Sequence, residues 1–223
     1  MTNFLPLVEQ FHSLQGEGYH AGKSAFFIRL AGCEVGCPWC DTKHSWDKEK
    51  YQSISIKNII NQIKESRKKG ASFCVITGGE PLHHNLDNFC KAIKKETSNE
   101  NQDSMQIHIE TSGVNSISGN YDWITLSPKR HSPPKNYFLE NCNEIKIIIN
   151  DKKDIKFAQD IKKEIKKNFR ISNLEKHLKK TKKIYYLQPA WNNEKGLSLA
   201  IEFVKRNPDW NLSLQTHKYL KIR

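Results

Sequence analysis

Short apolar runs rich in β-branched and aromatic residues alternate along the chain with segments of helical periodicity. Six such runs predict strands, at residues 25–31, 73–77, 105–110, 123–127, 144–149 and 184–188. Between the first two runs, the isoleucines from Ile56 to Ile63 follow helical spacing, with Ser55 as the predicted N-cap. Because strands that alternate with helices usually pair in parallel, the sequence predicts an α/β fold with mainly parallel strands.

The connection from Glu110 to Trp123 departs from this scheme. It is too short to hold a crossover helix together with its loops. We therefore expect a partial, reduced (βα)6-type barrel. The chain has 223 residues, of which 37% are hydrophobic, which suits one domain with a sizeable core.

Composition and charge restrict the environment and the partners. We expect a cytoplasmic protein, because no apolar stretch is long enough for a bilayer and residues 1–15 lack the regions of a secretory signal. The net charge is +12, with much of the excess in residues 162–183. A basic stretch can bind phosphates, but Arg and interleaved aromatics are scarce there. This favours a solvated helix face over nucleic-acid binding.

Three cysteines follow the first predicted strand at Cys-x3-Cys-x2-Cys spacing: Cys33, Cys37 and Cys40. Three thiolates can hold three irons of a 4Fe–4S cluster and leave the fourth iron open to a small molecule, whereas most clusters have four Cys ligands. A structural zinc site with His44 is the alternative, but no second ligand pair follows. The remaining cysteines lie in apolar runs and are expected to be buried: Cys74, Cys90 and Cys142.

Chemically functional residues recur just past the carboxyl ends of the predicted strands. They are Cys33, residues 77–81 (TGGEP), 110–112 (ETS), 127–129 (SPK) and 188–189 (QP). Ligands bind at this edge of parallel barrels and sheets. In the TGGEP segment, the paired glycines allow close approach to the backbone, and the Glu80 carboxylate can pair with an ammonium group.

A three-cysteine loop followed by a GGEP turn after the second strand resembles the radical S-adenosylmethionine (SAM) superfamily. The resemblance implies a single radical SAM domain over residues 1–223, with a substrate-binding segment at 1–24 and a variable lysine-rich helical segment at 151–183. It also implies that SAM chelates the open iron and is cleaved to a 5′-deoxyadenosyl radical. In such enzymes the cofactor carries the chemistry and the protein positions it.

The flanking segments resemble a narrower family, the 7-carboxy-7-deazaguanine synthases. These segments are residues 11–18 (FHSLQGEG), 27–30 (FIRL), 37–42 (CPWCDT), 186–189 (YLQP) and 214–219 (LQTHKY). The resemblance implies a carbon–nitrogen lyase of queuosine and 7-deazapurine biosynthesis. Such an enzyme converts 6-carboxy-5,6,7,8-tetrahydropterin to 7-carboxy-7-deazaguanine with release of ammonia, through hydrogen abstraction at C6 and ring contraction, and regenerates SAM.

Residue roles carry over from the family motifs. The implied cluster ligands are Cys33, Cys37 and Cys40, and the implied Mg²⁺ ligand is Thr42, whose hydroxyl is a suitable hard donor. The implied SAM contacts are Trp39, Cys40, Asp41, Gly79, Ser127, Pro128, Lys129 and Gln188, with Ser112 as a further candidate. The implied substrate contacts are Leu14, Gln15, Gly16, Arg29 and Thr77. Arg29 would hold the substrate carboxylate, because a guanidinium makes two parallel hydrogen bonds to it.

Several interpretations stay open at this point. Glu17 is either an acceptor for a guanine-like amino group or a turn or surface residue. The resemblance implies a homodimer and an electron donor such as flavodoxin or ferredoxin, and it assigns no role to Lys162–Lys183. An alternative function is a radical SAM activase that makes a glycyl radical on a partner protein. A non-catalytic zinc or nucleic-acid module is a third.

Overall fold

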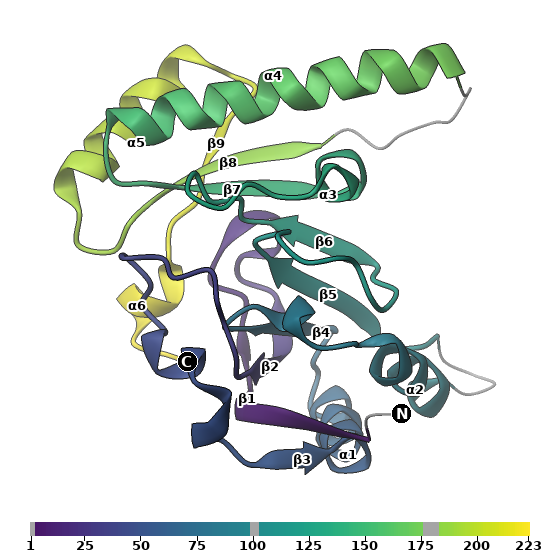
Figure 1. Cartoon of the computed structure of the whole chain (residues 1–223). Coiled ribbons are helices and arrows are strands. Elements are labelled where there is room, and N and C mark those ends of the chain that lie inside the picture. Colours follow the sequence, from purple (N-terminus) through teal and green to yellow (C-terminus); the bar gives the residue numbers. More distant parts are fainter. Residues whose placement is uncertain (1–2, 99–102, 176–182) are drawn as a thin grey trace.

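The computed structural model describes residues 3–98, 103–175 and 183–223. Within these ranges the strands form a nine-stranded sheet in the order β3-β1-β2-β4-β5-β6-β7-β8-β9 (Figure 1). The strands are β1 (Phe4–Leu14), β2 (Ser24–Leu30), β3 (Ser53–Ser55), β4 (Phe73–Gly78), β5 (Gln106–Thr111), β6 (Trp123–Leu126), β7 (Glu144–Ile149), β8 (Ile184–Pro189) and β9 (Asn211–Leu212).

Along this order, β2 and all strands from β4 to β9 pair in parallel, whereas β1 is antiparallel to both β2 and β3. The predicted α/β fold with mainly parallel strands is confirmed, and each predicted strand lies within one residue of its predicted ends. The sequence analysis predicts none of β1, β3 and β9. β1 contains Pro6 and lacks a regular alternation, so its periodicity does not reveal it.

The helices follow the strands as expected. They are α1 (Ile56–Lys68), α2 (Asp87–Thr97), α3 (Asn136–Asn141), α4 (Lys152–Glu175), α5 (Glu194–Arg206) and α6 (Thr216–Leu220). Ser55 Oγ accepts a hydrogen bond from the Asn58 N–H at 3.3 Å, which confirms the predicted N-cap. Residues 112–122 join β5 to β6 without a helix, as their length predicts. In the lysine-rich segment, residues 176–182 lie outside the described ranges.

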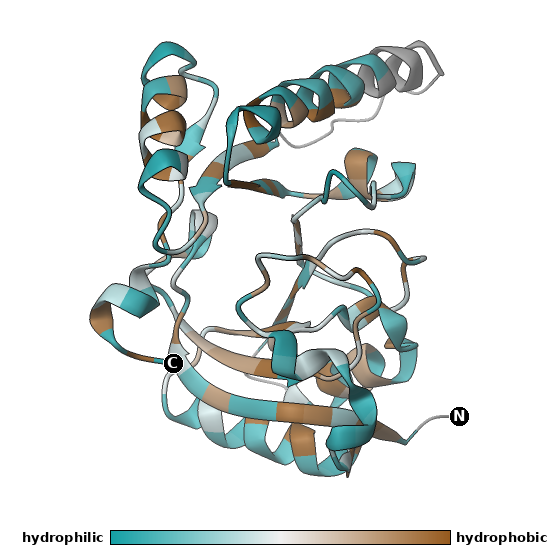
Figure 2. Cartoon of the chain, turned by 60° about the vertical axis from the view of Figure 1, so that its left-hand side comes forward, coloured by the Kyte–Doolittle hydropathy of each residue, from teal (hydrophilic) through white to brown (hydrophobic). Residues whose placement is uncertain are grey.

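The parallel strands present two faces of different chemistry, because successive side chains point to opposite sides of a sheet. The helix-covered face is apolar and includes Ile28, Ile76, Ile109, Leu126 and Ile147. α4 and α5 turn apolar residues toward this face and polar residues toward solvent (Figure 2). The opposite, inner face carries polar residues, among them Arg29, Thr77, Glu110, Thr125 and Lys146. This polar lining marks the inner face as the ligand-binding side.

Toward the amino ends of the central strands, the inner face is aromatic instead. His108 on β5 stacks on Phe73 with ring centroids 4.0 Å apart, and Tyr19 stacks on Trp123 at 5.1 Å. His20 packs edge-on against Trp123. Burial lowers the pKa of His108 to about 3 and the pKa of His20 to about 4, so both imidazoles are neutral at pH 7. The open, polar part of the inner face is thereby confined to the carboxyl half of the strands.

No helix in the described ranges has both the length and the apolar character needed to cross a membrane.

Candidate active site

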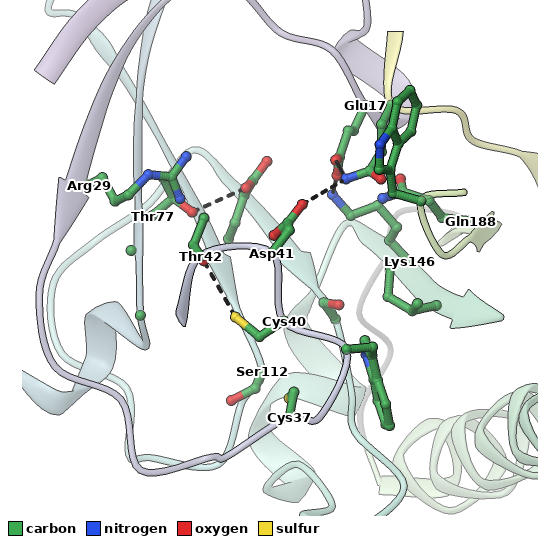
Figure 3. A pocket seen from close by; sticks show the side chains of 18 of the residues that line it. Glu17, Arg29, Cys37, Cys40, Asp41, Thr42, Thr77, Ser112, Lys146 and Gln188 are labelled. Atoms are coloured by element: carbon green, nitrogen blue, oxygen red, sulfur yellow. Dashed lines mark hydrogen bonds and ion pairs between the residues drawn. The ribbon is translucent and has the colours of Figure 1, made fainter. Parts of the chain in front are cut away.

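The inner face and the loops at its carboxyl edge enclose a cavity of about 730 Å³. The register of the strands places Arg29 on β2 directly beside Thr77 on β4, and Glu110 lies on the next strand. Lys146 on β7 and Gln188 on β8 complete the wall. In Figure 3, Arg29 and Thr77 stand on one side of this cavity, and Lys146 and Gln188 stand on the other.

Nearly all residues singled out from the sequence line this cavity. They are Leu14, Gln15, Gly16, Arg29, Cys33, Cys37, Trp39, Cys40, Asp41, Thr42, Thr77, Gly79, Ser112, Ser127, Lys129 and Gln188. Pro128 is buried and does not line it. Glu17 lines the cavity as well, which favours a site role over a surface turn. Segments from every part of the chain therefore meet at the sheet edge that the sequence indicates.

The cysteine loop forms one end of the cavity, and Figure 3 shows Cys37 and Cys40 in its lower part, near Ser112. Cys33, Cys37 and Cys40 are all free thiols. The loop is fixed by backbone hydrogen bonds from Gly32 N to Ser45 O (2.7 Å) and from Cys33 N to Trp46 O (3.1 Å). Three unpaired thiols on one anchored loop, open to a cavity, fit the ligand set of an iron–sulfur cluster.

Ligation of a metal by Cys33 and Cys37 would have to displace protons from their thiols. Burial raises the pKa of both Cys33 and Cys37, and the neighbouring cysteines add to the shift because like charges repel. Without metal, the thiols of Cys33 and Cys37 are therefore protonated at pH 7. Assembly of a cluster must release these protons, since a thiolate is the ligand. Cluster affinity is thus coupled to pH.

The GGE turn packs against the cysteine loop. Gly79 N donates to Leu30 O at 2.9 Å, and Glu80 N donates to Gly32 O at 2.9 Å. A Cβ on Gly79 would lie 2.5 Å from Gly32 O and 2.7 Å from Cys33 Cβ. The close approach that requires this glycine is therefore to the loop that carries the cysteines.

Glu80 joins β4 to β5. Its buried carboxylate accepts hydrogen bonds from Thr111 Oγ1 (2.6 Å), Ser112 N (2.8 Å), Ser112 Oγ (2.5 Å) and Leu82 N (3.2 Å). The sequence suggests that this carboxylate can pair with an ammonium group, whereas the structure gives it four hydrogen-bond donors from the protein. Glu80 thus fixes the turn that follows β4.

A second set of contacts surrounds Glu110. One of its carboxylate oxygens accepts from Gln15 Nε2 at 3.1 Å, and the other accepts from Thr77 Oγ1 at 3.2 Å. On the neighbouring strand, Arg29 Nε donates to Glu9 Oε1 at 2.9 Å. Glu9 is the partner of Arg29 among the described residues, so both terminal NH₂ groups remain for a ligand in the cavity.

Glu17 and Lys146 form a buried ion pair across the cavity wall, with 15% and 6% of their side chains exposed. Burial raises the pKa of Glu17, but the Lys146 ammonium and a hydrogen bond from Gln215 Nε2 (2.9 Å) outweigh it and bring the pKa to about 2. Glu144 lies near the same ammonium and accepts from Tyr19 N at 2.9 Å. Its burial dominates and raises its pKa to about 7.

The C-terminal segment closes the rim. Thr216 N and Oγ1 both donate to Gly16 O at 3.0 Å, which joins the two ends of the chain. Lys218 Nζ and Gln215 Nε2 both contact Asp41 on the cysteine loop, at 2.6 and 3.3 Å. Residues 214–219 of this segment match the family motif, but the sequence alone does not predict a role for them.

For three residues of the wall, Glu110, Lys146 and Gln215, the sequence does not predict the contacts that the structure shows. Lys146 stands in the run EIKIII, where an ionisable residue between apolar neighbours is itself a signal. A lysine in a buried strand needs a partner, and the partner lies 129 residues earlier in the chain. Single-sequence periodicity contains no information about such a distant pairing.

The parallel sheet, the three-cysteine loop after its first parallel strand and the GGE turn after the second define a radical SAM fold. The profile of the Radical SAM superfamily matches residues 27–133. The chain is 50% identical to 7-carboxy-7-deazaguanine synthase from Prochlorococcus marinus, with both chains covered completely, and 38% identical to that from Synechocystis, covering 100% of this chain and 96% of the relative.

A solved structure agrees with these relatives. The crystal structure of QueE from Escherichia coli has a TM-score of 0.71 and 31% identity, and the match covers 95% of this chain and 93% of that chain. The chain therefore belongs to the 7-carboxy-7-deazaguanine synthase family. Membership establishes a radical SAM enzyme with a 4Fe–4S cluster and SAM, and it does not favour the activase or the zinc module.

Proposed function

We propose that this protein converts 6-carboxy-5,6,7,8-tetrahydropterin to 7-carboxy-7-deazaguanine and ammonia. The observation that carries the proposal is the joint location of the cysteine loop, the GGE turn and Arg29 around one cavity. A cavity of about 730 Å³ has room for SAM and a bicyclic substrate together. The Arg29 guanidinium on one wall and the Glu17 and Glu110 carboxylates elsewhere in the lining suit a substrate with an acid at one end and amino groups at the other.

The proposed ligands divide between the two ends of the cavity. Cys33, Cys37 and Cys40 would hold the cluster, and SAM bound there would supply the 5′-deoxyadenosyl radical. The proposed SAM contacts are Trp39, Cys40, Asp41, Gly79, Ser127, Pro128, Lys129 and Gln188, with Ser112 as a further candidate. Pro128 would act in this proposal by positioning its neighbours Ser127 and Lys129, because it is buried and does not itself line the cavity.

The substrate would lie against the other walls. The free NH₂ groups of Arg29 would bind its carboxylate in two parallel hydrogen bonds. Leu14, Gln15, Gly16 and Thr77 would position the pterin ring, with Glu110 holding the side chains of Gln15 and Thr77 in place. Rigid placement matters here, because a radical must meet one particular C–H bond of the substrate and no other.

We further propose that Thr42 contributes a ligand to Mg²⁺. Its hydroxyl lines the cavity 3.5 Å from Cys40 Sγ, between the cluster loop and the substrate walls. Mg²⁺ commonly takes few protein ligands and completes its octahedron with waters and substrate oxygens. The substrate carboxylate would supply such an oxygen. Titration of product formation with Mg²⁺ in wild type and in Thr42→Val tests this role.

The proposed partners are an electron donor such as flavodoxin or ferredoxin, and a second copy of this chain. The net charge of +12 supports an acidic carrier, whose approach it would accelerate. Exposed Tyr219 and Leu220 on α6 support an additional protein contact, because such apolar surface favours burial. Light scattering of the intact protein tests the dimer directly.

The assay of the proposed function uses anaerobically reconstituted protein with SAM, Mg²⁺, a reductant and 6-carboxytetrahydropterin. We expect mass spectrometry to show 7-carboxy-7-deazaguanine, with SAM not consumed in proportion to product. SAM cleavage without this product would retain the cluster chemistry and overturn the substrate assignment.

A further inference from the structure

His131 lies in the loop between β6 and α3 and reaches the cysteine loop from the solvent side. The backbone turns tightly before it, with Ser132 N donating to Lys129 O at 3.2 Å. The His131 side chain is exposed, and its ring meets Trp39 edge-on with centroids 5.6 Å apart. Its Nε2 lies 2.9 Å from Val35 O and 3.9 Å from Cys37 Sγ. One imidazole nitrogen therefore faces both the backbone of the cysteine loop and a sulfur of that loop.

The tautomer follows from these partners. A carbonyl oxygen can only accept, so the contact with Val35 O requires a proton on His131 Nε2. Cys37 Sγ lies 3.9 Å from the same nitrogen, within hydrogen-bond range of a sulfur acceptor. Sulfur accepts over longer distances than oxygen because it is larger and more diffuse. The N–H is thus placed to be shared between the two acceptors.

We propose that His131 is a positioning residue that donates a hydrogen bond to Cys37 Sγ and raises the reduction potential of the cluster. The inference rests on the proposed ligand role of Cys37. A reduced cluster has one more negative charge than an oxidised one, and part of that charge lies on the thiolate sulfurs. A donor held beside one sulfur stabilises the reduced state more than the oxidised state. The electron needed to start the reaction would enter more readily.

Lys129 is a cationic group near Cys37. Burial lowers the pKa of Lys129, and Cys37 lies close enough to offset part of that shift. Its Nζ donates to Ser127 Oγ at 2.7 Å, which holds it in place. Because a change at His131 leaves this contact intact, variants of His131 isolate the effect of the imidazole from that of the lysine.

The test is an EPR-monitored redox titration of the reconstituted protein in three variants. His131→Phe keeps a ring against Trp39 but removes the N–H, and His131→Gln keeps an N–H donor of similar reach. His12→Phe is the matched control, since His12 is exposed on β1 and hydrogen-bonds Ser24 away from the cavity. We expect His131→Phe to lower the reduced-to-oxidised ratio at a fixed potential about threefold to tenfold, a shift of about 30 to 60 mV. His131→Gln should restore most of the wild-type reduction potential.

Equal midpoint potentials in wild type and His131→Phe, with full cluster content in both, would overturn the inference and leave the proposed function standing. Absence of a cluster from wild-type protein would overturn the proposed function itself. If His131→Phe binds no cluster, wild-type protein labelled with ¹⁵N-histidine tests the contact between His131 and the cluster instead. Pulsed EPR of its reduced cluster should show a weak histidine nitrogen coupling that disappears in His131→Gln, and a spectrum without that coupling would refute the contact.

Discussion

Replacement of Lys146 by Met should destabilise the protein strongly, although Met fills a similar volume. The side chain of Lys146 is 6% exposed and its ammonium pairs with Glu17, while the charges of Glu110 and Glu144 also act on it. Burial lowers the pKa of Lys146, but these three carboxylates outweigh it and raise the pKa above its usual value. Lys146→Met would leave buried carboxylates without a counter-charge.

The magnitude follows from the shift of Glu17. A fall of its pKa from 4.5 to about 2 corresponds to about 3 kcal/mol, at 1.36 kcal/mol per pKa unit. This value agrees with the loss of folding free energy, about 3 to 5 kcal/mol, that follows removal of one member of a buried ion pair. For a chain of this length, 3 kcal/mol lowers Tm by roughly 6 to 12 °C. Because the folded-state pKa of Glu17 is depressed, this stabilisation is present above pH 4.5 and is lost as pH falls toward 2.

The assay is anaerobic thermal unfolding of reconstituted protein at pH 7, followed by circular dichroism. Lys205→Met is the matched control, because Lys205 pairs with Glu202 on the surface of α5, where such pairs contribute about 0 to 1 kcal/mol. The double variant Lys146→Met/Glu17→Gln should recover part of the loss, since it removes the orphaned charge. A Tm for Lys146→Met no lower than that of Lys205→Met would refute the reasoning.

Three further changes test other parts of the site. Glu144→Gln keeps an acceptor for Tyr19 N. Because burial raises the pKa of Glu144 to about 7, the stability contributed by its protonated form is fully present below pH 4.5 and is lost as pH rises through 7. The Tm of the variant should therefore rise relative to that of wild type between pH 5 and pH 8, and a constant difference in Tm would contradict this. Arg29→Ala should raise KM for the substrate about tenfold to a hundredfold with SAM binding unchanged, as loss of a charge-assisted hydrogen bond predicts, and an unchanged KM would remove Arg29 as the carboxylate anchor. Gly79→Ala should lower iron and sulfide content, because its Cβ would lie 2.5 Å from Gly32 O, and a full cluster content would show that the loop adjusts without loss.

The sequence predicts β2 and β4 to β8 well because each is buried on its helix-facing side and has an apolar run that marks it. It fails for β1 and β9 for different physical reasons. β1 pairs antiparallel at the outer side of β2 and is half-buried along most of its length, so its residues follow no simple period. β9 has two residues and exists only because β8 offers a free edge. Both depend on neighbours rather than on local preference.

The same distinction applies to the site. Motifs that lie in one loop, such as the cysteines and the GGE turn, can be recognised because their function depends on local spacing. Lys146 cannot be recognised in that way, since its partner Glu17 is brought to it by the fold. Yet the two kinds of residue depend on each other: the ion pair holds the segment that carries Gln15 and Gly16, and Gln215 ties that segment to Asp41 on the cysteine loop. The pairs that sequence motifs do not reveal thus hold together the segments that the motifs identify.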